Sequence, residues 1–380
     1  MSRLQCRDQV NLTVRAADLL TEIFLVDSGF QRIASDVGQL ETKIGPGIYK
    51  ARFRVGQRQI DQLIEVKAGA GSLILDGPAV EFASPAPLPQ TLTHRKKHQE
   101  AAQDFSCAVH LEKGSGSQLY LFIRGLEESA PAPWTGVSLH DLDGNWLAGP
   151  EQGECNQEDN FFALNLALDP GTYRLRVEEE PGETYEMFVI TAAGWQTQIF
   201  ALTEAGWLPG VETCRAALPT ASVFMVREGQ GFTPDDAAFR RTELRRLGLM
   251  SRRKILTERT VNSLLKELSP DPMAAIFAAH LLMRQEPADS AAATLLTKGL
   301  APTLREHPDI QALQLHQEPG IRPVFPAPPM LNFSRECLAQ AAARGKVIIP
   351  PGSLTWQIME KQVNTPLWFV HRLDNMAAEK

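Results

Sequence analysis

The side chains that could carry catalytic or metal chemistry are few and scattered in this sequence. His280 lies among apolar residues at helical spacing without a second ligand four residues later. We therefore expect a hydrogen-bonded core residue rather than a metal ligand. Residues 140–144 read H-D-L-D-G, which resembles part of a calcium loop. The alternating acids and the distal Glu of an EF-hand are missing, so a hairpin turn is the favoured interpretation.

Patterns typical of nucleotide binding or nucleophilic catalysis are also missing. Residues 114–117, G-S-G-S, lack the Lys-Ser/Thr ending of a P-loop. No G-x-S-x-G occurs, and the five cysteines form no C-x-x-C pair, so we expect free thiols. A triad assembled in space from the eight histidines is the alternative left open. We predict a protein that is not an enzyme and has no metal site and no cofactor.

The strongest charge feature is the basic stretch 240–266, which holds nine Lys or Arg residues against two Glu residues. Arginine pairs at 240/241 and 245/246 would lie along one side of a helix. Three interpretations stay open: a solvated helix face that pairs with acidic neighbours in the fold, a surface for an acidic protein partner, or a nucleic-acid surface. The candidate partner-binding residues are Arg240, Arg241, Arg245, Arg246, Arg252, Arg253 and Lys254.

Length and composition bound the class of protein. A chain of 380 residues is long enough for two or three domains, and 43% hydrophobic with 22% charged residues is typical of a globular protein. The net charge of −7 argues against coating nucleic acid over the whole surface. No run of 18 apolar residues and no signal peptide is recognisable. We therefore expect a cytoplasmic protein without membrane contact.

An internal repeat is the most informative feature of the first two thirds. Residues 45–55 read G-P-G-I-Y-K-A-R-F-R-V and residues 169–177 read D-P-G-T-Y-R-L-R-V, at an offset of 124 positions. The same offset continues without a gap, so that residues 64–75 overlie residues 188–199. The sequence therefore predicts one module that is present twice.

The repeat extends upstream with a shorter offset. Residues 21–27, T-E-I-F-L-V-D, resemble residues 135–141, T-G-V-S-L-H-D, at an offset of 114. A loop insertion near residues 149–160 explains the difference between the two offsets.

Each copy predicts a tight turn followed by a half-buried antiparallel strand. Pro fixes φ and Gly supplies the backbone freedom that the turn needs. In the first copy Lys50, Arg52 and Arg54 alternate with Tyr49, Ala51, Phe53 and Val55. In the second, Arg174 and Arg176 alternate with Tyr173, Leu175 and Val177. This period of two, with frequent turns, favours a β-sandwich over a doubly wound sheet.

The P-G-x-Y strand entry resembles the small β-sandwich repeats of the PEGA and carboxypeptidase-regulatory-like kind. The resemblance covers two stretches of about 70–80 residues each, in the size range of small domains. It implies a fold rather than an activity, because such modules serve as spacers, binding units and assembly domains.

A linker is expected between the two copies. Residues 84–90 read S-P-A-P-L-P-Q, which is stiffened by proline, and residues 94–100 read H-R-K-K-H-Q-E, which is basic and solvated. The alternative to an exposed connector is a partner-binding or protease-sensitive segment, in which Arg95, Lys96 and Lys97 form an accessible cleavage site.

The last third predicts helices. Thr233 and Pro234 form a helix start, as do residues 269–272, S-P-D-P. The segment from Met273 to His280 has apolar residues at helical spacing. Trp356 and Trp368, in a structured tail, are expected to close the helical core.

Taken together, these patterns predict an α+β multidomain chain with two tandem antiparallel β-sandwich modules followed by an all-α C-terminal domain. The expected bounds are 1–78 for the first module, 79–104 for the linker, 105–230 for the second module and 231–380 for the helical domain.

The C-terminal third resembles a helical region of uncharacterised bacterial proteins that accompany caspase-like peptidases. Residues 271–282, D-P-M-A-A-I-F-A-A-H-L-L, and 307–313, H-P-D-I-Q-A-L, carry the resemblance together with the tail segments 326–334, 347–354 and 366–370. It implies a protein that binds another protein, as adaptor, regulator or substrate of a bacterial multi-protein system such as one of antiviral defence. Nucleic-acid binding through the basic stretch is the alternative. Carbohydrate or cell-surface binding by the sandwiches is a third hypothesis, against which the missing secretion signal counts.

Overall fold

The computed structural model describes residues 9–126, 132–179, 183–204, 215–267, 271–300, 304, 306–315, 323–359 and 365–373. Its elements mix strands and helices, so the chain is an α+β protein. The strands are β1 Val10–Arg15, β2 Glu22–Val26, β3 Arg32–Val37, β4 Gln39–Ile44, β5 Gly47–Val55, β6 Arg58–Val66, β7 Ser72–Asp76, β8 Leu111–Glu112, β9 Ser117–Arg124, β10 Val137–His140, β11 Trp146–Ala148, β12 Glu154–Asn156, β13 Phe161–Leu168, β14 Gly171–Glu179, β15 Glu183–Thr191, β16 Trp195–Glu204, β17 Arg215–Ala216, β18 Ser222–Arg227 and β19 Val370–Leu373. The helices are α1 Lys96–Cys107, α2 Ala237–Met250, α3 Glu258–Glu267, α4 Pro272–Arg284, α5 Ser290–Lys298, α6 Pro308–Gln314, α7 Asn332–Ala343 and α8 Leu354–Ile358. Within the described residues, no helix is both long and apolar enough to cross a membrane.

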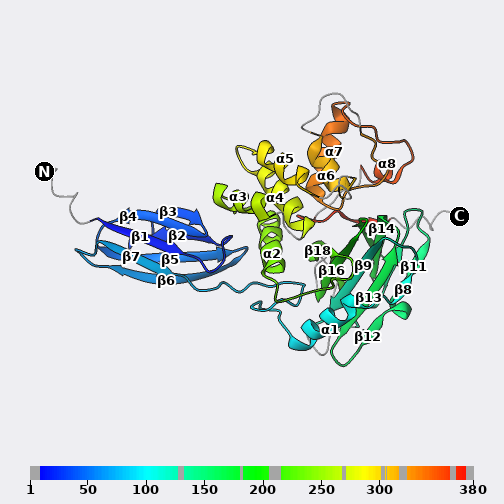
Figure 1. Cartoon of the computed structure of the whole chain (residues 1–380), viewed down its shortest axis with the longest axis horizontal. Coiled ribbons are helices and arrows are strands. Elements are labelled where there is room, and N and C mark those ends of the chain that lie inside the picture. The colour runs from blue at the N-terminus through cyan, green and yellow to red at the C-terminus, as the bar shows by residue number, and fades with distance from the viewer. Residues whose placement is uncertain are drawn as a thin grey trace.

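Strands β1–β7 form two sheets at one end of the molecule (Figure 1). One sheet has the order β4-β1-β7 and the other the order β3-β2-β5-β6. In β5 the side chains of Ala51, Phe53 and Val55 are buried while the basic residues between them are half-buried, which is the alternation seen in the sequence. Phe53 shares one hydrophobic cluster with Leu12 of the other sheet, so both sheets contribute to the core.

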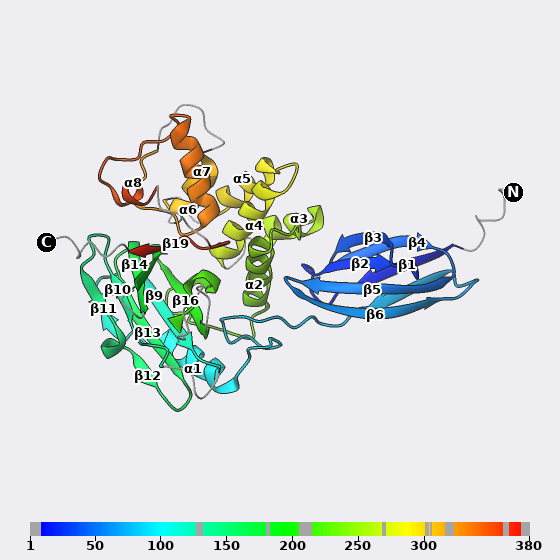
Figure 2. The same ribbon diagram turned by 180° about the vertical axis from the view of Figure 1, so that it is seen from behind.

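The strand order of this first group occurs a second time in the chain. The order β11-β10-β14-β15 repeats β3-β2-β5-β6, and β13-β9-β16 repeats β4-β1-β7. The strand directions agree as well, since β1 is antiparallel to β4 and parallel to β7, while β9 is antiparallel to β13 and parallel to β16. The second group is larger because β8, β12, β17 and β18 extend one of its sheets. Figure 2 shows the two groups on either side of helix α2.

Strand register supports the two offsets found in the sequence. Ile23 of β2 faces Phe53 of β5, and Val137 of β10 faces Val177 of β14. Strand β2 therefore corresponds to β10 at an offset of 114, and β5 corresponds to β14 at an offset of 124.

The tyrosine of the P-G-x-Y motif makes the same contact in both copies. Tyr49 Oη donates to the carbonyl oxygen of Gly45 at 2.9 Å, and Tyr173 Oη donates to that of Asp169 at 2.7 Å. Each hydroxyl closes the turn four residues before it, which explains why the motif needs Tyr rather than Phe.

The gap-free match is wrong one strand later. Gly47 pairs with Val66, whereas Gly171 pairs with Thr191, so β6 and β15 correspond at an offset of 125. The β14–β15 hairpin is one residue longer than the β5–β6 hairpin. Because side chains alternate between the two faces of a strand, a one-residue error assigns each side chain of β6 to the wrong face.

The linker expected at 79–104 is not an exposed connector. Arg124 at the end of β9 is fully buried and donates to three carbonyl oxygens of this segment, those of Ser84, Pro85 and Thr93, at 2.9, 2.8 and 2.7 Å. Proline-rich segments expose carbonyl oxygens that no sheet partner takes, and a guanidinium with several donors can satisfy them. The buried residues of the segment include Val80, Phe82, Ser84, Ala86 and Leu88.

The basic triplet at the end of this segment is exposed but ordered. Arg95 is the N-cap residue of α1, and Lys96 and Lys97 lie in its first turn. Lys97 Nζ is 2.6 Å from Asp159 Oδ1. The triplet is exposed at the start of a helix, and its sensitivity to proteases stays a prediction. Helix α1 also runs across the boundary expected at residue 104.

Two aspartates begin helices of the C-terminal part. Asp236 caps α2 by accepting from Ala238 N at 2.8 Å, so the helix starts later than the Thr233 cap predicts. Asp271 caps α4 with Pro272 at the first helical position. Asp271 Oδ1 also accepts from Met225 N of β18 at 3.0 Å, which ties α4 to the second group of strands.

The C-terminal part is not all-α. Strand β19 pairs antiparallel with β15 and thereby extends the sheet β11-β10-β14-β15 of the second group. Trp368, just before β19, is fully buried and donates from Nε1 to Ala221 O at 2.7 Å, as a core role predicts. Trp356 is 56% exposed and does not close the core.

Candidate protein interface

An ion-pair cluster lies on the outer face of strands β5 and β6. Arg52 donates to both carboxylate oxygens of Asp61, at 2.8 and 3.0 Å, and Lys50 Nζ lies 3.2 Å from Asp61 Oδ2. The hydrogen bond from Arg52, opposed in part by desolvation, lowers the pKa of Asp61. The side chain of Asp61 is 32% exposed, so its carboxylate faces solvent at the edge of the sheet.

The second copy contains the same cluster at equivalent positions. Arg176 Nε lies 2.7 Å from Glu186 Oε2, and Arg174 lies 3.7 Å from the same oxygen. Glu186 corresponds to Asp61 in strand register, because each faces the equivalent arginine of the neighbouring strand. The side chain of Glu186 is fully buried, however.

Strand β19 is what covers the cluster in the second copy. Residues 184–187 of β15 pair with residues 370–373 of β19. His371 Nε2 lies 3.6 Å from Glu186 Oε1. Phe188 stacks on Phe369 at 5.8 Å and on His371 at 5.5 Å between ring centroids. Strand β19 and the residue before it therefore supply backbone pairing, a phenyl ring and an imidazole ring to this edge.

The first copy has no such cover in the part of the chain that the structure describes. Strand β6 pairs with β5 alone and forms the edge of its sheet. Register places Leu63 where the second copy has Phe188, and Leu63 is 72% exposed whereas Phe188 is fully buried. Figure 1 shows β6 along the margin of the first group that faces away from helices α3 and α5.

Further exposed apolar side chains border this edge. Ile48 at the start of β5 is 62% exposed, and Phe30 in the β2–β3 turn is 82% exposed. Lys50 Nζ lies 5.7 Å from the centroid of the Phe30 ring. Exposed large apolar side chains that gather at one place are typical of protein-binding surfaces. A nine-residue edge strand without Pro is also open to pairing with another chain. We call β6 with Ile48, Lys50 and Phe30 the β6 edge.

Sequence reasoning missed the β6 edge because of the register error. At an offset of 124, Asp61 of the first copy aligns with Tyr185 of the second, so the correspondence between Asp61 and Glu186 is lost. Allowing one inserted residue in the second hairpin aligns Asp61 with Glu186 and Leu63 with Phe188. The signal was therefore present, but an ungapped comparison could not find it.

Three of the predicted partner-binding arginines are engaged inside the fold. Arg240 pairs with Asp18 at 2.9 Å, in a contact between α2 and the first group of strands. Arg246 is buried and pairs with the buried Glu243 at 2.9 Å. Arg245 is buried too, with 5% of its surface exposed. Helix α2 lies between the two groups of strands, so Arg240, Arg245 and Arg246 are paired or buried there and do not form an exposed basic face.

The remaining predicted residues differ in their placement. Arg241 is half-buried on α2. Arg252, Arg253 and Lys254 follow the helix and line a small pocket with residues of α4. The predicted partner-binding residues therefore do not form one surface. Within the set, Arg252, Arg253 and Lys254 line a common pocket.

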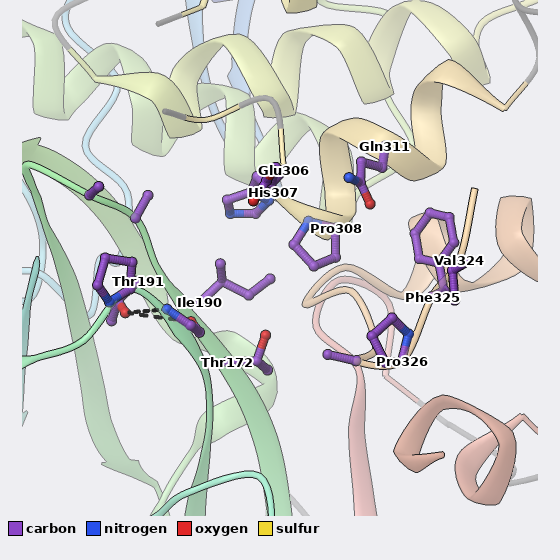
Figure 3. Close-up of a pocket in the computed structure, with 15 residues that line it drawn as sticks. Thr172, Ile190, Thr191, Glu306, His307, Pro308, Gln311, Val324, Phe325 and Pro326 are labelled. Atoms are coloured by element: carbon purple, nitrogen blue, oxygen red, sulfur yellow. Dashed lines mark hydrogen bonds between the residues drawn. The ribbon is translucent and has the colours of Figure 1, made fainter. Parts of the chain in front are cut away.

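A larger cleft lies between the second group of strands and the C-terminal helices. Its volume is about 780 Å³, and Figure 3 shows Thr172, Ile190 and Thr191 on one side with His307 and Pro308 opposite. His307 Nδ1 accepts from the backbone N–H of Asp309 at 3.3 Å. Burial lowers the pKa of His307, so the ring is neutral and its proton sits on Nε2. The side chain is fully buried, its Nδ1 caps α6, and its Nε2 has no hydrogen-bond partner among the described residues.

The other candidate residues have structural surroundings. His280 is fully buried, and its Nε2 lies 3.0 Å from Ser334 Oγ, as the core interpretation predicts. The H-D-L-D-G segment forms the turn between β10 and β11, where Asp141 accepts from Asn145 N at 2.8 Å. Among the described residues, no group of three or more His, Cys, Asp or Glu side chains is placed to hold a metal ion.

Comparison with known proteins adds little. No family model matches the sequence, and no curated protein matches it. Among solved structures, the chain is similar to the Bacillus anthracis TIE protein at 11% identity and a TM-score of 0.20, over 47% of this chain and 31% of that chain. It is also similar to GBS52, the minor pilin of Streptococcus agalactiae, at 10% identity and a TM-score of 0.17, over 53% of this chain and 99% of that chain. The chain thus spans less than a third of the TIE protein. Scores this low carry no argument, and the resemblance to PEGA-type repeats stays a prediction.

Proposed function

We propose that this chain is a non-enzymatic interaction protein, built on two copies of one β-sandwich module, and that its β6 edge receives a strand from another polypeptide. The observation that carries the proposal is the cover of the equivalent edge in the second copy by β19. One module is completed by a strand of the chain itself. The other presents the same ion-pair cluster, and no described strand pairs with its edge.

The second copy indicates the chemistry of the missing strand. In β19 and the residue before it, Phe369 and His371 lie two positions apart and contact the same face of the sheet. A partner strand would place an apolar or aromatic side chain on Leu63 and a basic side chain near Asp61. Backbone hydrogen bonds would supply affinity and these two side chains specificity, as in other strand-addition complexes.

The identity of the partner is a further part of the proposal. The resemblance of the C-terminal third suggests a caspase-like peptidase of a bacterial multi-protein system, with this chain as adaptor, regulator or substrate. Strand addition is compatible with each of these roles, because in each the chain would hold an extended segment of the partner at a sheet edge.

The experiment is capture of binding proteins from a native host followed by hydrogen exchange of the complex. The test variant is Leu63→Glu, which adds a charge at an exposed position and leaves the core untouched. The matched control is Ile74→Glu, an exposed residue on the edge strand β7 of the other sheet.

We expect the wild type and Ile74→Glu to capture the same partner, and residues 58–66 to gain exchange protection in the complex. Leu63→Glu should reduce capture by about tenfold or more, since a charge would face the partner's apolar side chain. Equal capture by Leu63→Glu, or protection confined to other strands, would contradict strand addition at β6.

A further inference from the structure

A small pocket with an excess of positive charge lies between the ends of helices α2 and α4. Its volume is about 370 Å³. Four basic side chains line it, and Glu286 is the one acidic residue of the lining. The lining residues are Leu249, Arg252, Arg253, Lys254, Leu281, Arg284, Gln285 and Glu286. We call this site the cationic pocket.

The backbone at the mouth of the pocket is strained. Arg253 N donates to Gly248 O at 2.9 Å and Arg252 N donates to Leu249 O at 3.2 Å, which is the hydrogen-bond pattern that ends a helix with a left-handed residue. That residue is Arg252, with φ of 52°. Glycine is the usual choice there because a side chain makes this conformation unfavourable.

Helix α7 ends with the same pair of backbone hydrogen bonds, but with glycine at the left-handed position. Lys346 N donates to Ala341 O and Gly345 N donates to Ala342 O, both at 2.9 Å. Gly345 occupies the left-handed position with φ of 66°. The chain thus uses glycine for this turn at α7 and an arginine at α2. Strain that a simple substitution would relieve is typical of functional positions.

The basic side chains of the pocket lack carboxylate partners. Within the described part of the chain, Arg252, Arg253, Lys254 and Arg284 form no ion pair within 4.0 Å. The Nε of Arg253 is buried and has no hydrogen-bond acceptor among those residues. Arg284 is held on the ring of Phe333, with its guanidinium carbon 4.9 Å from the ring centroid.

The charges also act on one another. Desolvation, followed by the positive charge of Arg252, lowers the pKa of Arg284, while the nearby Glu336 opposes the shift. Four positive charges that share a pocket with one carboxylate, and form no ion pair with it, favour the binding of an anion.

We propose that the cationic pocket binds a phosphoryl group. Arginine guanidinium groups present planar pairs of N–H donors that match the oxygens of a phosphate, and lysine adds a point charge. A volume of 370 Å³ lies at the small end of the range for ligand pockets, which suits a phosphorylated small molecule or the phosphorylated end of a polymer. This site is separate from the β6 edge and does not depend on the strand-addition proposal.

The test is calorimetric titration of the full chain at low ionic strength with inorganic pyrophosphate, together with thermal unfolding. The main variant is Arg252→Gly, which removes one charge and relieves the left-handed strain. The control is Arg344→Gln, which removes one exposed charge at the end of α7.

We expect the wild type and Arg344→Gln to bind pyrophosphate alike. Arg252→Gly should bind about tenfold more weakly or worse, because a charge-assisted contact is lost. The same variant should unfold about 2 °C higher, since the strain and the charge repulsion are both reduced. Misfolding of the variant would weaken binding but would also lower the unfolding temperature. Weaker binding together with a higher unfolding temperature therefore reports on the site itself.

Two further titrations distinguish the sources of the phosphoryl group. ATP represents a free phosphorylated molecule, and a single-stranded oligonucleotide with and without a 5′-phosphate represents a polymer end. Binding of ATP, or a preference for the phosphorylated oligonucleotide, that weakens in Arg252→Gly supports the site. Absence of pyrophosphate binding, or equal binding by Arg252→Gly, would overturn the proposal.

Discussion

Acid is expected to destabilise the fold through two histidines that are buried in their neutral form. Burial lowers the pKa of His98 to about 4 and that of His280 to about 3. The His98 ring is held near the carbonyl of Asp159, with Nε2 and the oxygen 2.5 Å apart, and the His280 ring contacts Ser334. In the unfolded chain both histidines would titrate near pH 6.5.

The sign follows from this difference. A histidine whose folded pKa is depressed stabilises the fold above pH 6.5, and this contribution is lost as the pH falls toward the folded value. At pH 5.0 the loss is about 2 kcal/mol per histidine, or about 4 kcal/mol for both, at about 1.4 kcal/mol per pH unit. Burial raises the pKa of Asp271 to about 6, which acts in the opposite direction and returns about 1.4 kcal/mol at pH 5.0. The effect of the histidines is therefore the larger one, and these three groups together lower the free energy of unfolding by about 2 to 3 kcal/mol at pH 5.0.

The assay is urea unfolding, followed by tryptophan fluorescence, at pH 7.5 and pH 5.0. His280→Gln removes one titrating group, so the loss of unfolding free energy between the two pH values should shrink by about 2 kcal/mol. His98→Gln should have a similar effect, and the two changes should add because the sites are on separate elements. An unchanged pH dependence in both variants would refute the argument that these rings are buried in their neutral form.

Three other substitutions test one contact between distant segments and two equivalent local turns. Arg124→Met leaves the carbonyls of Pro85 and Thr93 without their donor, and we expect a loss of about 2 to 6 kcal/mol by urea unfolding, with increased proteolysis of residues 79–95. Resistance equal to that of the wild type would show that the segment is held by other contacts. Tyr49→Phe and Tyr173→Phe each remove one hydroxyl donor in equivalent turns, so each should cost about 1 kcal/mol. A marked difference between the two would mean that the turns are not equivalent.

Sequence patterns located the repeated unit because its signals are local. A Pro-Gly turn and a side-chain period of two depend on neighbouring residues, and both copies keep them at Pro46 to Val55 and Pro170 to Val177. The strand order and the tyrosine contacts agree with that repeat. The turn between β10 and β11 and the core position of His280 were predictable for the same reason.

The candidate sites were less predictable because they depend on residues far apart in the chain. The β6 edge is recognised by its difference from β15, and that difference exists only because β19 returns from residue 370 to cover one copy. The cationic pocket could be predicted in part, since Arg252 to Lys254 belong to the basic stretch, but Arg284 joins them from α4.

Local spacing by itself determined the repeated turns, the alternating strands and the helical character of the last third. Tertiary structure decided which charged side chains are exposed and able to bind another molecule. It buried Arg246 against Glu243, drew the proline-rich segment around Arg124, and left Asp61 exposed while Glu186 is covered. The physical reason is that backbone preference acts over a few residues, whereas burial and charge pairing are set by whichever distant segment packs alongside.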